Sequence, residues 1–150
     1  MGGVISHVTA SPASAIRTFP LRLPVSASVD LVSAPAVTYA RCQGGRRVHC
    51  VVDGDTLWMK AIKIRIADID TPEISKPRCA EEKALGERAT RRLVQLVNAG
   101  PFEVHAWPDR DADRYGRKLR VLVRDGRSLG DVLVSEGLAR TWTGRRLPWC

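Results

Sequence analysis

The chain has 150 residues, enough for one domain with a sizeable hydrophobic core. Its 24 lysines and arginines outnumber its 16 aspartates and glutamates, and the net charge of +8 favours polyanionic partners such as nucleic acid or anionic lipid. No uninterrupted apolar run approaches the roughly 20 residues of a membrane-spanning helix, so we expect no membrane span.

Residues 1–40 differ in composition from the rest of the chain. Their only charged side chains are Arg17, Arg22 and Asp30, in a background of Ser, Ala, Val, Pro and Thr. This composition predicts a disordered leader or a poorly formed signal segment, with residues 34–36 as a small-x-small cleavage site. A start codon placed too far upstream would give the same pattern. We favour a secreted or periplasmic location, with the cytoplasm as the alternative.

Residues 41–150 carry the patterning of a folded domain. Residues 48–52 predict a strand followed by a turn at Asp53-Gly54, and 56–59 predict a second strand. In 62–66 isoleucines alternate with Lys and Arg, a period of two that indicates a half-buried strand.

The following stretch changes to helical spacing. Apolar residues of the segment 80–98 recur on one face, which predicts a long amphipathic helix that ends before Gly100-Pro101. Residues 101–107 and 118–124 predict two more strands, and Ser128 can cap a short helix that reaches about residue 136. The order predicts an α+β fold, a small five-stranded barrel with one long and one short helix packed outside.

The four cysteines, Cys42, Cys50, Cys79 and Cys150, contain no CxxC pair. An even number without that spacing suits two disulfides better than a zinc site, and three pairings are open. We expect Cys42 to pair with Cys50 across a short loop and Cys79 with Cys150. Four reduced thiols in a cytoplasmic protein are the alternative.

Acidic side chains gather where two predicted strands end. VVDGDT, residues 51–56, places Asp53 and Asp55 at a turn, and RIADIDTPE, residues 65–73, places Asp70 at a strand end. Adjacent strands can bring Asp55 and Asp70 together, and two carboxylates in one place repel unless a counterion lies between them. Because no His or Cys belongs to the pattern, the oxygen ligands favour Ca²⁺ or Mg²⁺, with water or substrate completing the shell.

Basic residues near these acids suit phosphate chemistry. Arg65 and Arg117 are fork-shaped donors for phosphate oxygens. Hydrolysis of a phosphodiester needs charge neutralised on the phosphoryl oxygens and a water delivered in line, which Glu73 can orient or deprotonate. Each residue alone is more often a solvated charge, but together they indicate a catalytic site.

Five motifs follow one another along the chain: VVDGDT, RIADIDTPE, LGERA, DRYGR and EGLAR. Their order resembles that of the staphylococcal nuclease family over about residues 46–142, and the combination is specific although each motif alone is weak. The resemblance implies a five-stranded OB-type β-barrel with helices outside it. It also implies calcium-dependent hydrolysis of phosphodiesters in DNA and RNA that leaves 3′-phosphate ends.

The resemblance implies a role for each matching acidic position. Asp55 and Asp70 match the calcium-binding carboxylates, and Thr71 matches the residue that gives a backbone carbonyl to the ion. Asp53 matches a nearby acid that supports these ligands.

The remaining matches concern the substrate. Arg65 and Arg117 match the arginines that bind and stabilise the phosphate, and Glu73 matches the glutamate usually assigned as general base. Arg114 and Tyr115 match a basic residue and a tyrosine that contact the nucleotide's phosphate.

The end of the sequence departs from the family pattern. The family's type member has a third long helix there, whereas this chain stops after TGRRLPWC. The base-stacking tyrosine has no clean match, and Trp142 either stacks a base or packs in the core. A Cys79–Cys150 bridge could tie down this tail. Its GRR run either contacts nucleic acid or is a solvated loop.

Two other functions are open at this point: a non-catalytic module that binds nucleic acid or protein, and an accessory protein of a mobile element. The intact acids and arginines favour the enzyme. We expect DNA or RNA as substrate, no obligate protein partner and a monomer; the sequence does not choose between DNA and RNA or between endo and exo cleavage.

Overall fold

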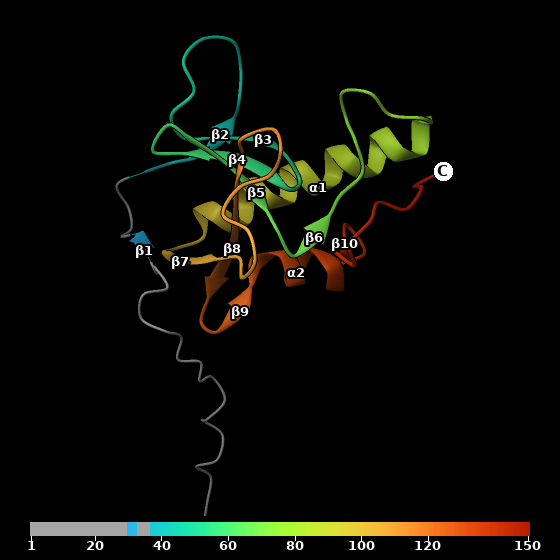
Figure 1. The fold of residues 1–150 in the computed structure, drawn as a ribbon. Coiled ribbons are helices and arrows are strands. Elements are labelled where there is room, and N and C mark those ends of the chain that lie inside the picture. The colour runs from blue at the N-terminus through green and yellow to red at the C-terminus, as the bar shows by residue number, and fades with distance from the viewer. Residues whose placement is uncertain (1–29, 33–36) are drawn as a thin grey trace, which may run out of the picture.

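The computed structural model describes residues 30–32 and 37–150 (Figure 1). Most of the predicted leader therefore lies outside the described residues. Two pieces of the segment before Arg41 join the domain, since Asp30–Val32 pair with a later strand and Tyr39 is buried in the core.

One large sheet and one small sheet make up the β structure. The large sheet has the order β1-β7-β8-β5-β4-β3-β2, with β9 paired to β8, and β10 pairs with β6 in the small sheet. The strands are β1 Asp30–Val32, β2 Ala40–Arg41, β3 Cys50–Asp53, β4 Thr56–Met59, β5 Ile62–Ile66, β6 Ile69–Asp70, β7 Phe102–Ala106, β8 Lys118–Arg124, β9 Arg127–Ser128 and β10 Arg140–Thr141.

The predicted α+β class is confirmed. All five predicted strands form, as β3, β4, β5, β7 and β8, although β3 begins two residues later than expected. Among the described residues the strand pairing leaves the large sheet open, with β1 and β2 as its last strands.

The long helix α1, Ala80–Asn98, agrees with the predicted segment. Its N-terminus is capped by Cys79, whose Sγ accepts a hydrogen bond from the backbone N–H of Glu82 at 3.4 Å. Its buried face packs along the sheet and contacts β3 (Figure 1). This face contains Ala89, Leu93, Leu96 and Val97, as the helical spacing predicts.

The short helix α2, Leu129–Ser135, also forms where it was predicted. Ser128 caps it, because its hydroxyl accepts a hydrogen bond from the N–H of Asp131 at 3.0 Å. Within 30–32 and 37–150, neither helix has the length and apolar character needed to cross a bilayer.

The parallel pairing of β5 with β8 brings two distant parts of the chain together. Arg65 in β5 lies opposite Leu119 in β8. The loop that precedes β8, which contains Arg117, therefore reaches the same edge of the sheet as Arg65.

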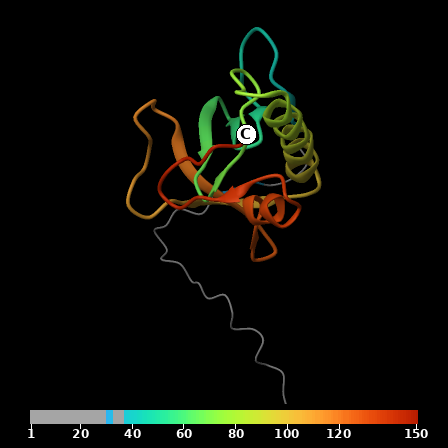
Figure 2. The same cartoon turned by 90° about the vertical axis from the view of Figure 1, so that its right-hand side faces the viewer.

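Two disulfides confirm the expected pairing: Cys42–Cys50 and Cys79–Cys150. The second bond joins residues 71 apart and holds the C-terminal tail, residues 142–150, at the start of α1. Figure 2 shows this red tail passing across the strands before it reaches the bond.

Candidate active site

A cavity of about 630 Å³ opens where the ends of β3, β5 and β6 meet the loop before β8. It gathers the predicted site residues, except Thr71, from separate parts of the chain. Those that line it are Asp53, Asp55, Arg65, Asp70, Glu73, Arg114, Tyr115 and Arg117. Trp142 lines it as well, with the Arg65 guanidinium 5.7 Å from its ring centroid, so its ring is directed to the cavity more than to the core.

The turn between β3 and β4 presents Asp53 and Asp55 to the cavity. A shift in register between Val51 and Asp53 bends β3 there. Gly54 between the two acids packs so closely on α1 that a Cβ would lie 2.8 Å from the Cβ of Ala89. The turn is thus held against the long helix.

Asp70 reaches Asp55 from a different sheet. We expected neighbouring strands to carry the two acids, but Asp70 ends β6, which pairs with β10. The backbone N–H of Thr71 donates to Oδ2 of Asp55 at 3.2 Å and so ties the two acidic segments together. Asp55 and Asp70 are both buried, at 7% and 3% exposure.

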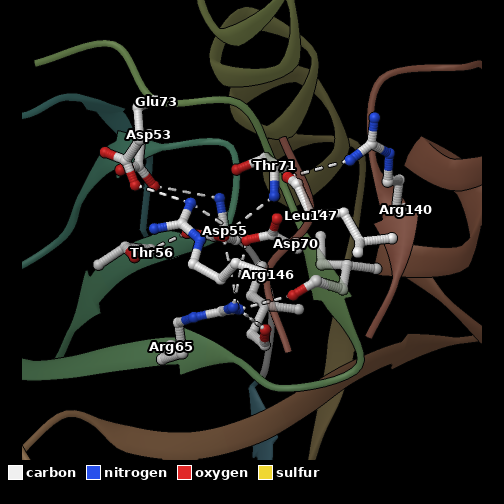
Figure 3. Close-up of polar contacts among 12 residues, drawn as sticks. Asp53, Asp55, Thr56, Arg65, Asp70, Thr71, Glu73, Arg140, Arg146 and Leu147 are labelled. Carbon is white, nitrogen blue, oxygen red and sulfur yellow. Dashed lines mark hydrogen bonds and ion pairs between the residues drawn. The ribbon is translucent and has the colours of Figure 1, made fainter. Parts of the chain in front are cut away.

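Arg65 lies between these two carboxylates (Figure 3). Its Nη1 is 3.5 Å from Oδ2 of Asp55 and its Nη2 is 3.8 Å from Oδ1 of Asp70. Nη1 also donates to the carbonyls of Ile66 and Ile69, the latter at 2.8 Å. The guanidinium is therefore fixed by the chain that carries Asp70.

Arg117 is oriented by an acid that the sequence analysis did not single out. Nε of Arg117 donates to Oδ2 of Asp113 at 2.7 Å, and the backbone N–H groups of Tyr115 and Arg117 donate to Oδ1 of the same carboxylate. Asp113 thus organises the loop that holds Arg117, and its place in DRYGR was the available signal.

The exposed ring of Tyr115 lies between two guanidinium groups. Arg114 is 4.9 Å and Arg117 5.6 Å from its centroid, and Arg114 donates to the tyrosine hydroxyl at 2.8 Å. This is a flat aromatic surface with cations at its side, which can contact a nucleotide.

Glu73 follows Asp70 and is held from behind by Glu82 of α1. The N–H of Glu73 donates to Oε2 of Glu82 at 3.1 Å, and the N–H of Arg78 donates to Oε1 at 2.9 Å. In front, Oε1 of Glu73 lies 2.9 Å from Nη2 of Arg146 in the C-terminal tail.

The crowded acids hold protons more tightly than usual. Burial first, and then the charge of Asp55, raises the pKa of Asp53 to about 8. Burial also raises the pKa of Asp70, although Arg146 and Arg65 oppose that effect. Both carboxyl groups are therefore harder to ionise than in water, first because they are buried.

The donor set suits a hard cation. Asp53, Asp55 and Asp70 offer oxygens alone, and Oδ1 of Asp70 is buried without a hydrogen-bond partner among the described residues. Over the same residues, no three acids, histidines or cysteines are arranged as a ready-made metal site. A cation held by these carboxylates would need further ligands to complete its shell.

The tail supplies two residues to the site that sequence reasoning missed. Arg146 approaches Glu73 and Asp70, and Nε1 of Trp149 donates to Oδ2 of Asp70 at 3.3 Å. The GRR run and the expected Cys79–Cys150 bond pointed to this segment, but neither predicts which side chains the segment contacts.

Comparison with known sequences identifies the relationship. A family model described as "Staphylococcal nuclease homologue" matches residues 63–147, more than half of the chain. The chain belongs to the staphylococcal nuclease family.

Three relatives show how far the similarity extends. Endonuclease YncB of Bacillus subtilis (strain 168) is 37% identical over 93 residues, 59% of this chain and 44% of that protein. SPbeta prophage-derived endonuclease YokF of the same strain is 38% identical over 93 residues, with 59% and 31% covered. Micrococcal nuclease of Shigella flexneri is 32% identical over 132 residues, with 79% and 68% covered. The chain spans less than half the length of the two Bacillus relatives.

Proposed function

We propose that this chain is a nuclease that hydrolyses phosphodiester bonds of DNA and RNA and leaves 3′-phosphate ends. One observation carries the proposal: Arg65, Arg117 and Glu73 line the same cavity as the acidic pair Asp55 and Asp70. The names endonuclease and micrococcal nuclease among the relatives support it.

Each side chain has a distinct part in this reaction. Arg65 and Arg117 bind the non-bridging oxygens of the scissile phosphate and stabilise the charge that grows on them during attack. Glu73 accepts the proton of the attacking water, which is positioned in line with the leaving oxygen. Arg114 and Tyr115 hold the nucleotide next to that phosphate.

Calcium is the proposed cofactor. Asp55, Asp70 and the carbonyl of Thr71 would hold it, and Asp53 would support them from behind. When bound, the ion would supply positive charge to the phosphate and to the nucleophilic water. The buried Oδ1 of Asp70 supports this assignment, because among the described residues it forms ion pairs with Arg65 and Arg146 but accepts no hydrogen bond.

We also propose that β3, β4, β5, β8 and β7 form an OB-type barrel. Their order and the parallel β5–β8 pair support it, and barrels of this type are partly open. For the compartment we propose export to an oxidising environment, which the two disulfides support.

The test is cleavage of single-stranded DNA by the full chain, with disulfides formed, in calcium and in a chelator. We expect cleavage in calcium alone, with 3′-phosphate product ends. Glu73→Gln should lower kcat by about 10²- to 10⁴-fold, the usual contribution of a general base, and Arg65→Ala by about 10²- to 10³-fold.

Two matched variants serve as controls. Glu81→Gln and Arg91→Ala remove the same charges from exposed positions of α1 and should cleave like the wild type. A folded protein that binds DNA and cleaves nothing in calcium would favour the non-catalytic binding module.

A further inference from the structure

The C-terminal tail is fixed by the residues that follow Arg146. Nη1 of Arg140 donates to the carbonyl of Leu147 at 3.1 Å (Figure 3). The Arg140 guanidinium also lies 3.7 Å from the ring centroid of Trp149, and Cys150 is bonded to Cys79. The position of Arg146 is therefore set by four separate contacts of the tail, counting the Trp149–Asp70 hydrogen bond.

Arg146 uses one nitrogen for both of its acidic neighbours. Nη2 lies 2.9 Å from Oε1 of Glu73 and 3.2 Å from Oδ1 of Asp70. A guanidinium has five N–H donors, on Nε, Nη1 and Nη2. Both ion pairs of Arg146 use Nη2, and among the described residues the donors on Nε and Nη1 have no protein partner. The side chain is 52% exposed, which leaves these donors open to a ligand.

A second cavity lies on the other side of Arg146. It has a volume of about 350 Å³, and Arg146 and Glu73 line both it and the larger cavity. Lys76 and Arg78 bring two more positive charges to its wall. Its other acid, Glu82, already accepts the backbone N–H groups of Glu73 and Arg78. Among the described residues Lys76 and Arg78 form no ion pair, so the cavity offers these two cations to an anion.

We propose that Arg146, with Lys76 and Arg78, forms a second phosphate-binding subsite that holds the nucleic-acid phosphate next to the one being cleaved. The proposal rests on the proposed nuclease function and extends it to a strand that crosses both cavities. A strand that runs past Glu73 leaves the first cavity at Arg146, where the free donors meet its next phosphate. The Cys79–Cys150 bond keeps Arg146 at that crossing point.

The first experiment measures binding without cleavage. A fluorescein-labelled single-stranded 12-mer is titrated with the full chain in EDTA at several salt concentrations. Each cation that neutralises a phosphate of single-stranded DNA adds about 0.7 to the slope of log K against log salt. Arg146→Ala should lower the slope by about 0.7 and weaken binding about 10-fold.

Arg145→Ala is the matched control, since Arg145 is the adjacent exposed arginine and lines neither cavity. It should leave the slope closer to that of the wild type than Arg146→Ala does. Equal slopes for wild type and Arg146→Ala would overturn the subsite.

The second experiment compares substrates in calcium. Arg146→Ala should raise KM for the 12-mer by a larger factor than KM for a dinucleoside monophosphate, because the short substrate has no neighbouring phosphate. An equal fall in kcat on both substrates would show that Arg146 acts through Glu73. A rise in kcat/KM on both substrates would show that the tail inhibits cleavage. Either result overturns the proposal.

The disulfide is tested with the double variant Cys79→Ser/Cys150→Ser, which leaves no unpaired thiol. Its salt slope should fall toward that of Arg146→Ala, and a slope equal to the wild type would show that the tail stays in place without the bond. If the wild type cleaves neither substrate, the nuclease function fails, while the EDTA titration still tests the subsite by itself.

Discussion

Single residues decide how closely the acids of the site approach one another. Gly54 separates Asp53 from Asp55, and a Cβ there would meet Ala89 at 2.8 Å and Cγ2 of Thr71 at 2.9 Å. Neither neighbour can move freely, because Ala89 belongs to α1 and Thr71 is buried beside Asp70.

Gly54→Ala should therefore destabilise the fold by about 1–3 kcal/mol through overpacking. Gly44→Ala, where a Cβ would meet nothing within 4 Å, should change stability by less than about 0.5 kcal/mol. Urea unfolding of both variants measures the difference, and similar midpoints would contradict the close packing of the turn.

The acidic site residues could be predicted because they lie within two short contiguous motifs, VVDGDT and RIADIDTPE. Asp53, Asp55, Asp70 and Glu73 do line one cavity. Arg146 could not be predicted in the same way, since its position depends on a chain reversal and a bond to Cys79. The catalytic or binding roles of Arg146 and of these acids remain predictions.

One element, the segment between β6 and α1, carries Glu73 and has little regular structure of its own. Glu82, buried at 5% exposure, holds it through the N–H groups of Glu73 and Arg78. These hydrogen bonds, that to Arg78 first, lower the pKa of Glu82 below its ordinary value of 4.5.

The direction of this pKa shift determines how the stabilisation by Glu82 depends on pH. A lowered pKa means that the folded state favours the carboxylate, so the stabilisation is complete above about pH 4.5 and is lost as the pH falls through the folded pKa. Glu82→Gln should cost about 1 kcal/mol at pH 7 and nearly nothing in acid. Denaturant unfolding at both pH values checks this, with the exposed Glu81→Gln as control; a cost that does not change with pH would contradict it.

The elements differed in how well periodicity predicted them. Helix α1 and strands β4, β5, β7 and β8 are long enough to show a period, and they form where expected. The strands β2, β6, β9 and β10 have two residues each, which is too short for any alternation. They are fixed by partners far along the chain instead, as β10 is by β6.

At the scale of the whole molecule, the two disulfides differ in what they constrain. Cys42–Cys50 closes a separation of 8 residues and Cys79–Cys150 one of 71. From the entropy that each bond removes from the unfolded chain, the short loop should stabilise the fold by about 2.5 kcal/mol and the long loop by about 4 kcal/mol.

Cys79→Ser/Cys150→Ser should therefore lower the melting temperature more than Cys42→Ser/Cys50→Ser does. Thermal unfolding followed by circular dichroism under non-reducing conditions compares them. The reverse order would show that strain in the folded state, or structure in the unfolded chain, outweighs loop length.

Calcium should stabilise the whole domain, because it would bind the folded chain alone. At a concentration 100 times its dissociation constant the gain is about 2.7 kcal/mol. Melting temperatures in calcium and in EDTA measure it, and Asp55→Asn or Asp70→Asn should remove most of the increase. A melting temperature independent of calcium in the wild type would contradict the proposed ligands.

The Cys79–Cys150 bond also determines the order in which the parts of the site assemble during folding. Every described strand and helix precedes Cys150 in the chain, so all of them are synthesised before the bond can form. The acids and Arg65 can meet as soon as the sheet folds, whereas the bond that joins the tail of Arg146 to α1 forms only after two thiols have been oxidised. Assembly of this site thus finishes with a redox step, in whichever compartment allows one.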